Sequence, residues 1–93
     1  MDNLKDILIE RGYPEKAAIV TAQNLLKLTG RFASALQNWV DTKDTPKVES
    51  HGYTSDGLLK RFKGMTYPAA LLTLDWLDRE PEKAKSAIER GIR

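Results

Sequence analysis

The sequence predicts an all-α protein that forms a single compact domain over residues 1–93, built from about six short helices. Its length of 93 residues corresponds to one domain and leaves little room for a second. Its apolar residues recur at intervals of three and four, the spacing of a helix face, rather than at the interval typical of strands. Glycines and prolines separate these segments at positions where helices start and stop.

The chain is expected to open with two helices. The first spans about residues 4–11, with Asp2 or Asn3 as its N-cap, since both side chains accept hydrogen bonds from free backbone N–H groups. Pro14 opens the second helix, because proline is tolerated in the first turn, and this helix extends to about residue 28. The face of the second helix that we expect to be buried consists of Ala18, Ala22, Leu25 and Leu26.

A third helix of about residues 31–41 follows Gly30. One face of this helix carries nearly all of its apolar area and is expected to pack in the core, through Phe32, Leu36, Trp39 and Val40. Residues 42–53 then mix charges with Pro46 and Gly52 and show no periodicity, which is typical of a surface loop.

Three further helices are expected after this loop. The fourth spans about residues 56–63, Pro68 opens the fifth, and Pro81 both ends the fifth and opens the sixth. Leucines at intervals of three line one face of the fifth helix, so we predict that it is the central helix of the protein. Trp39 and Trp76 are then expected to share the core.

The two halves of the chain resemble one another. Tyr13-Pro14 falls on Tyr67-Pro68 at a shift of 54 residues, and AAIVTAQNL from Ala17 falls on AALLTLDWL from Ala69 at a shift of 52. One interpretation is a duplicated three-helix unit, with copies at residues 2–41 and 55–92 joined by loop 42–54. The other is that short helices with similar caps and alanines coincide once a gap is allowed.

Residues with catalytic or metal-binding chemistry are scarce. The chain has no cysteine and one histidine, His51, which stands in the predicted loop without a paired ligand. The sequence contains no glycine-rich phosphate loop, no nucleophile elbow and no HExxH zinc motif. We therefore expect no enzymatic activity, no metal and no cofactor.

Net charge and hydropathy indicate the cellular compartment of the protein and the classes of partner that it can bind. The chain has 15 Lys and Arg against 13 Asp and Glu, and the net charge of +2 is too small to indicate a polyanionic partner by itself. No apolar run approaches the length of a membrane span, and the N-terminus lacks the regions of a signal peptide. These features predict a cytoplasmic protein without a membrane partner.

A segment of the first half carries a more specific pattern. It combines a Thr early in one helix, an apolar pair, a turn Gly, an apolar residue and a Trp on the next helix, and a closing Pro; these are Thr21, Leu25, Leu26, Gly30, Leu36, Trp39 and Pro46. The pattern resembles the helix-turn-helix of phage repressors of the lambda type. The resemblance implies a DNA-binding protein in which the helix of residues 31–41 recognises bases.

A DNA-binding role would depend on five polar residues of this segment. Gln and Asn are the side chains that read adenine edges, and basic residues nearby contact phosphates, which selects Lys27, Arg31, Gln37, Asn38 and Lys43. Residues 21–46 have a net charge of only +1, however, which is low for a segment that neutralises several phosphates. The other interpretation is a helical hairpin held together by Phe32, Leu36 and Trp39.

The function that we expect is a non-enzymatic interaction module that binds another protein, or a second copy of itself as a homodimer, through a helical groove. The short amphipathic helices have apolar stripes that are wide for a core of 93 residues, and an exposed apolar patch marks an interaction site. The alternative is a small DNA-binding regulator that uses a helix-turn-helix at about residues 21–46.

Overall fold

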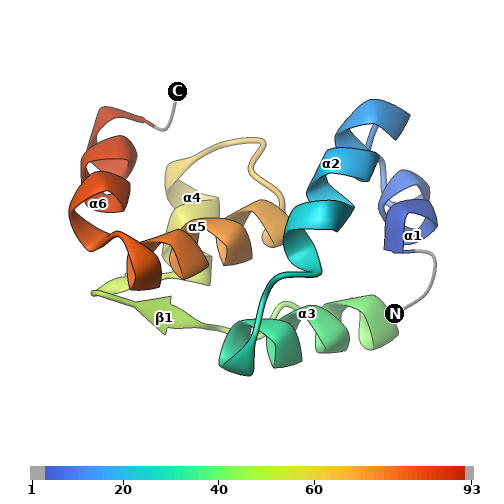
Figure 1. The fold of residues 1–93 in the computed structure, drawn as a ribbon, viewed down its shortest axis with the longest axis horizontal. Helices are drawn as coiled ribbons and strands as arrows, with labels where there is room; N and C mark the ends of the chain where they lie inside the picture. The colour runs from blue at the N-terminus through green and yellow to red at the C-terminus, as the bar shows by residue number, and fades with distance from the viewer. Residues whose placement is uncertain (1–3, 92–93) are drawn as a thin grey trace.

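A computed structural model describes residues 4–91 and shows the all-α fold that the sequence predicts (Figure 1). Within these residues there are six helices and one two-stranded hairpin. The elements are α1 (Leu4–Glu10), α2 (Glu15–Leu25), α3 (Gly30–Thr42), β1 (Glu49–Ser50), β2 (Tyr53–Thr54), α4 (Ser55–Arg61), α5 (Tyr67–Arg79) and α6 (Pro81–Arg90). The predicted caps of the first helix, Asp2 and Asn3, lie outside the described residues.

Helix α5 is the central helix, as predicted. It runs across the middle of the molecule in Figure 1, and α2, α3, α4, α6 and β1 all pack against it. Its leucines at intervals of three have no exposed surface, because they face these neighbours: Leu71, Leu74 and Leu77. The side chain of Thr66 caps the helix by accepting a hydrogen bond from the backbone N–H of Ala69.

Helix α2 ends earlier than predicted, at Leu25 rather than near residue 28. The next turn tightens, since the N–H of Lys27 bonds to the carbonyl of Asn24 and the N–H of Leu28 to that of Leu25. This turn carries Leu28 into the core at 7% exposure but leaves Leu26 at 65% exposure. The prediction that Leu26 belongs to the buried face was therefore wrong.

The two tryptophans do not share the core. Trp39 is buried, with 8% of its surface exposed, whereas Trp76 is partly exposed and packs against the edge of the core. The aromatic neighbour of Trp39 is instead Tyr67, whose hydroxyl donates a hydrogen bond to the carbonyl of Pro46 at 2.6 Å. The expectation of a shared tryptophan core is therefore right for Trp39 alone.

The loop predicted at residues 42–53 contains a hairpin that the sequence analysis missed. Glu49 pairs with Thr54 and Ser50 with Tyr53, and the two residues between the strands have positive φ angles. Their φ values are 48° at His51 and 84° at Gly52, as in the two-residue turns that suit antiparallel strands. Strands of two residues are too short to show a period in the sequence.

The duplication that is one interpretation of the repeated sequence agrees with the order of three helices in each half, but the packing of the halves differs. Helix α5 packs along α6, whereas α2 and α3 pack more against α5 than against each other. Tyr13 precedes α2, while Tyr67 is the first residue of α5 and is buried. The two Tyr-Pro turns nevertheless meet, because the hydroxyls of Tyr13 and Thr66 share a hydrogen bond.

Candidate functional site

A groove lies between the C-terminal half of α5 and the end of α2. It has a volume of about 720 Å³, and we call it the Trp76 groove. Its lining residues come from α2 and the following turn on one side and from α5 on the other: Asn24, Lys27, Thr29, Leu72, Thr73, Asp75, Trp76, Asp78 and Arg79.

The α5 wall of the Trp76 groove supplies apolar surface. Leu72 and Trp76 are four residues apart, so they are neighbours on one side of the helix, and both are partly exposed. The indole N–H of Trp76 donates to Oε1 of Glu80 at 3.0 Å, which holds the ring in one orientation. This hydrogen bond, together with Lys83, lowers the pKa of the Glu80 carboxyl below its ordinary value.

Trp76 also borders a second hollow, between α5 and α6. The other residues of that hollow are Glu82, Lys83, Ser86 and Arg90. The partly exposed indole therefore stands between two depressions of the surface and contributes to both. An aromatic side chain in this position offers a large apolar contact area to a partner.

Exposed apolar side chains lie on more than one side of α2. Val20 lies four residues before Asn24, so it is on the same side of α2 as this groove residue. Its exposure is 57%, and that of Leu26 is 65%. Ile19, seven residues before Leu26, adds a third side chain with 40% exposure. The apolar surface of α2 is therefore wider than the part that the core covers.

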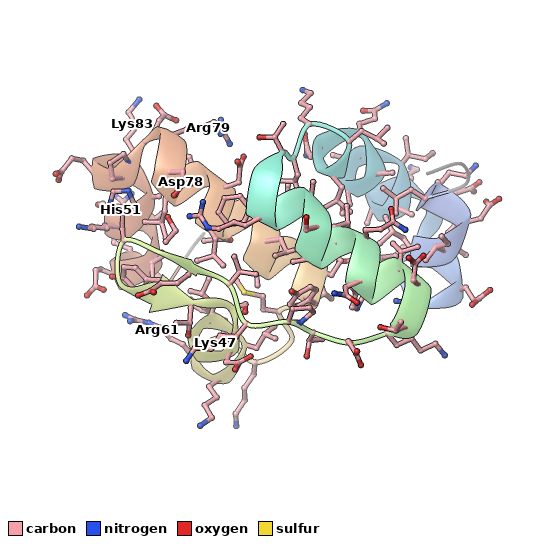
Figure 2. The ribbon with its side chains drawn as sticks, turned by 90° about the horizontal axis from the view of Figure 1, so that it is seen from below. Lys47, His51, Arg61, Asp78, Arg79 and Lys83 are labelled. Atoms are coloured by element: carbon pink, nitrogen blue, oxygen red, sulfur yellow. The ribbon has the colours of Figure 1, made fainter. Side chains whose placement is uncertain are left out.

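Two ion pairs lie on the α5 side: one, between Arg79 and Asp75, lines the Trp76 groove, and the other, between Lys83 and Glu80, lies outside it. Nε of Arg79 lies 3.0 Å from an oxygen of Asp75, and Nζ of Lys83 lies 3.4 Å from one of Glu80. On the opposite wall, Lys27 forms no ion pair with any residue between 4 and 91. Figure 2 shows Arg79 and Lys83 at the same end of the molecule as Asp78 and His51.

Asp78 joins the groove to the hairpin. Its Oδ1 accepts a 2.5 Å hydrogen bond from the buried hydroxyl of Ser50, and Nη2 of Arg31 lies 3.1 Å from its Oδ2. The same guanidinium donates to the carbonyl of Glu49 at 2.9 Å. The hydrogen bond from Ser50 and the charge of Arg31 lower the pKa of Asp78 below its ordinary value. These contacts fix the start of α3, the hairpin and the end of α5 to one another.

The five residues predicted for DNA binding do not form one cluster. Arg31 is held by Asp78 and Glu49, and the amide of Gln37 donates to Oδ1 of Asp41 at 2.8 Å. Lys27 lines the Trp76 groove, and Lys43 is the exposed residue after α3, with a φ of 66°. Only Arg31 and Asn38 come together, in a hollow beside α3.

That hollow contains a basic residue that the sequence analysis did not select. Lys47 lines this hollow together with Asn38 and Ser34, which are on α3. Lys47 comes from the segment before β1, and no sequence signal relates a loop lysine to a helix face nine residues away along the chain. Trp76 was predicted to lie in the core and not at the surface. It stands in the apolar stripe of its helix, and the sequence does not distinguish a buried residue of such a stripe from an exposed one.

Comparisons of this chain with protein-family models, with curated proteins and with solved structures find no match. Between residues 4 and 91, no group of three His, Cys, Asp or Glu side chains is arranged to hold a metal ion. In the same part of the chain, none of the helices has the length and apolar character needed to cross a membrane.

Proposed function

We propose that this chain is a protein-interaction module that binds a helix of a partner protein in the Trp76 groove. The observation that carries the proposal is the position of Trp76, which is partly exposed and lines two depressions of the surface. Two helices that border a groove form the kind of surface into which an amphipathic helix packs its apolar face.

The composition of the surface supports this proposal. Binding energy in protein interfaces concentrates on a few aromatic and basic side chains, and Trp is the most enriched among them. Trp76 and Leu72 supply an apolar centre, while Lys27, Asp75 and Arg79 supply a polar rim. An apolar centre inside a charged rim is the arrangement that excludes water from the strongest contacts.

A selection experiment tests the proposal. The probe is a phage-displayed library of designed amphipathic helices, with the folded chain as bait. We expect helices that bind the chain and lose affinity by about tenfold or more when Asn24→Arg places a long charged side chain in the groove. Ser34→Arg adds the same side chain to the hollow beside α3 and is the matched control. Failure to select any helix, or binding that survives Asn24→Arg, overturns the proposal.

DNA binding through α3 is the second candidate function. One observation favours it: Arg31, Asn38 and Lys47 line one hollow beside α3, so a base-reading amide and two cations share the same surface. Arg31 would have to exchange its contacts with Asp78 and Glu49 for DNA. This competition is the reason that we rank DNA binding second.

A mobility-shift titration tests this second candidate. The probe is a pool of random-sequence duplex DNA, titrated at low and at moderate salt. DNA binding predicts an affinity that falls as salt rises, because phosphate contacts release counterions, and a further loss in Lys47→Glu. The control is Lys85→Glu, an exposed lysine of α6 outside the hollow. Absence of a shift at micromolar protein and low salt rejects DNA binding.

A further inference from the structure

The α5 wall of the Trp76 groove has its polar side chains bonded within the chain. The hydroxyl of Thr73 donates to the carbonyl of Ala69 at 2.8 Å, and the indole N–H of Trp76 donates to Glu80. A donor that already has an acceptor gains little from a partner, because a new hydrogen bond would only replace the existing one. What this wall offers a partner is therefore the apolar surface of Leu72 and Trp76.

The charged side chains of the same wall are compensated as well. An oxygen of Asp75 lies 3.0 Å from Nε of Arg79. An oxygen of Asp78 lies 3.1 Å from Nη2 of Arg31. Each pair joins one carboxylate to one guanidinium, so its net charge is zero. The α5 wall therefore leaves no unbalanced charge for a partner to neutralise.

The α2 wall differs, because its polar side chains are exposed and have no partner in the described part of the chain. Between residues 4 and 91, the side chains of Asn24, Lys27 and Thr29 make no hydrogen bond. Lys27 also forms no ion pair with these residues. The unbalanced charge of the groove is therefore positive and lies on the α2 wall.

The chemistry of this wall selects the group that it can bind. The ammonium of Lys27 has three donors and no acceptor, so its partner must supply an acceptor. The backbone carbonyls of a bound helix are used within that helix, except in its last turn, so the acceptor must come from a side chain. A carboxylate accepts hydrogen bonds only and carries the opposite charge, and hydrogen bonds between charged groups are the strong ones.

From this division of the two walls we infer that the helix bound in the Trp76 groove is acidic, with a carboxylate at Lys27 and apolar side chains against Leu72 and Trp76. The inference rests on the proposed function of the groove and names the chemistry of its partner. The amide of Asn24 and the hydroxyl of Thr29 line the same wall and supply further donors for the carboxylate. The partner is then an amphipathic helix with Asp or Glu beside its apolar stripe.

The sequences of selected helices give the first test. The probe is the phage-displayed library of amphipathic helices, with the positions beside the apolar stripe randomised and the full chain as bait. We expect Asp and Glu to be enriched over Lys and Arg at these positions. Selection against Lys27→Glu should abolish this enrichment. Equal use of both charges with the parent chain, or enrichment of basic residues, overturns the inference.

A charge reversal tests the position of the acidic contact. Fluorescence anisotropy measures the Kd of one selected, labelled acidic helix. We expect Lys27→Glu to weaken binding by about fivefold or more, because repulsion replaces attraction. Lys16→Glu is the matched control, since it makes the same exchange at an exposed residue of α2 that does not line the groove. Circular dichroism checks that both variants keep their helices, and equal losses of affinity in the two variants overturn the inference.

Two further measurements separate the inference from the proposed function. A helix whose acidic residue is changed to Lys should bind Lys27→Glu more tightly than it binds the parent chain, and the opposite order overturns the inference. Trp76→Ala reports the apolar contact alone and should weaken every helix that binds in the groove. Helices that lose affinity in Trp76→Ala but not in Lys27→Glu leave the proposed function standing and overturn the inference. Failure to select any helix overturns both.

Discussion

The indole ring of Trp39 stacks on the phenol ring of Tyr67, with ring centroids 6.5 Å apart and ring planes inclined by 30°. This contact joins α3 to the first turn of α5. Arg11 adds a third segment, because its guanidinium lies 4.3 Å from the centroid of the Trp39 ring and donates to the carbonyl of Trp39 at 2.7 Å. Trp39 is therefore the point at which the turn between α1 and α2, helix α3 and the central helix α5 meet.

Replacement of the two tryptophans should have unequal effects on stability. Trp39→Ala removes a buried ring and leaves a cavity, so we expect the free energy of unfolding to fall by about 3–5 kcal/mol. Trp76→Ala removes a partly exposed ring and should cost about 1–2 kcal/mol. Denaturant unfolding followed by circular dichroism measures both values. A larger loss for Trp76→Ala than for Trp39→Ala would contradict the assignment of Trp76 to the edge of the core.

The turn of the hairpin predicts opposite effects at two adjacent positions. His51→Asn should raise the free energy of unfolding by up to about 0.5 kcal/mol, because Asn tolerates the left-handed backbone and Asn-Gly is the favoured pair in such turns. Gly52→Ala should lower it by about 1–2 kcal/mol. A Cβ at Gly52 would meet no atom within 4 Å, so this loss would come from the backbone alone. Thermal unfolding of both variants measures the difference, and a destabilised His51→Asn would indicate a specific role for the imidazole.

Tyr67 predicts a loss of stability in alkali. Burial, followed by the charge of Asp56, raises the pKa of its phenol from 10.0 to about 12 in the folded protein. A group with a raised folded pKa stabilises the fold below its unfolded pKa and loses this contribution as the pH rises through the folded value. The stability of the parent should therefore decline between pH 10 and about 12.

Tyr67→Phe separates this contribution from other alkaline effects. At neutral pH the variant should be less stable by about 1 kcal/mol, because it lacks the hydrogen bond to Pro46. In alkali its stability should decline less than that of the parent, so the difference between the two proteins should shrink. Denaturant unfolding at a series of pH values measures this, and a constant difference up to pH 12 would contradict the raised pKa of Tyr67.

The ion pair between Arg31 and Asp78 should contribute little as an isolated pair. Their side chains are 52% and 35% exposed, so water screens the interaction. A double-mutant cycle with Arg31→Ala and Asp78→Ala should give a coupling of about 0.5–1 kcal/mol, and added salt should reduce it. A coupling well above this range would show that the hydrogen bonds to Ser50 and Glu49 make the network cooperative.

The sequence by itself determined the helices, because the signals that start and stop them are local. Pro68 and Pro81 stand in the first turns of α5 and α6 as predicted, and Gly91 follows α6 with a φ of 96°. The leucines of α5 identified the central helix from their spacing alone, since an apolar stripe must be buried. The candidate binding surfaces, by contrast, depend on which exposed residues lie next to one another in space.

Only the tertiary structure decided the position of Trp76 at the edge of the core, the exposure of Leu26, and the place of Lys47 in the same hollow as Asn38. Each of these depends on how neighbouring elements cover a helix, and a spacing pattern marks an apolar face without stating how much of it is covered. The hairpin at Glu49–Thr54 also belongs to this group, because strands of two residues gain their stability from Ser50 bonding to Asp78 and from packing against α5. Both contacts join residues that are distant in the sequence, so no local signal precedes them.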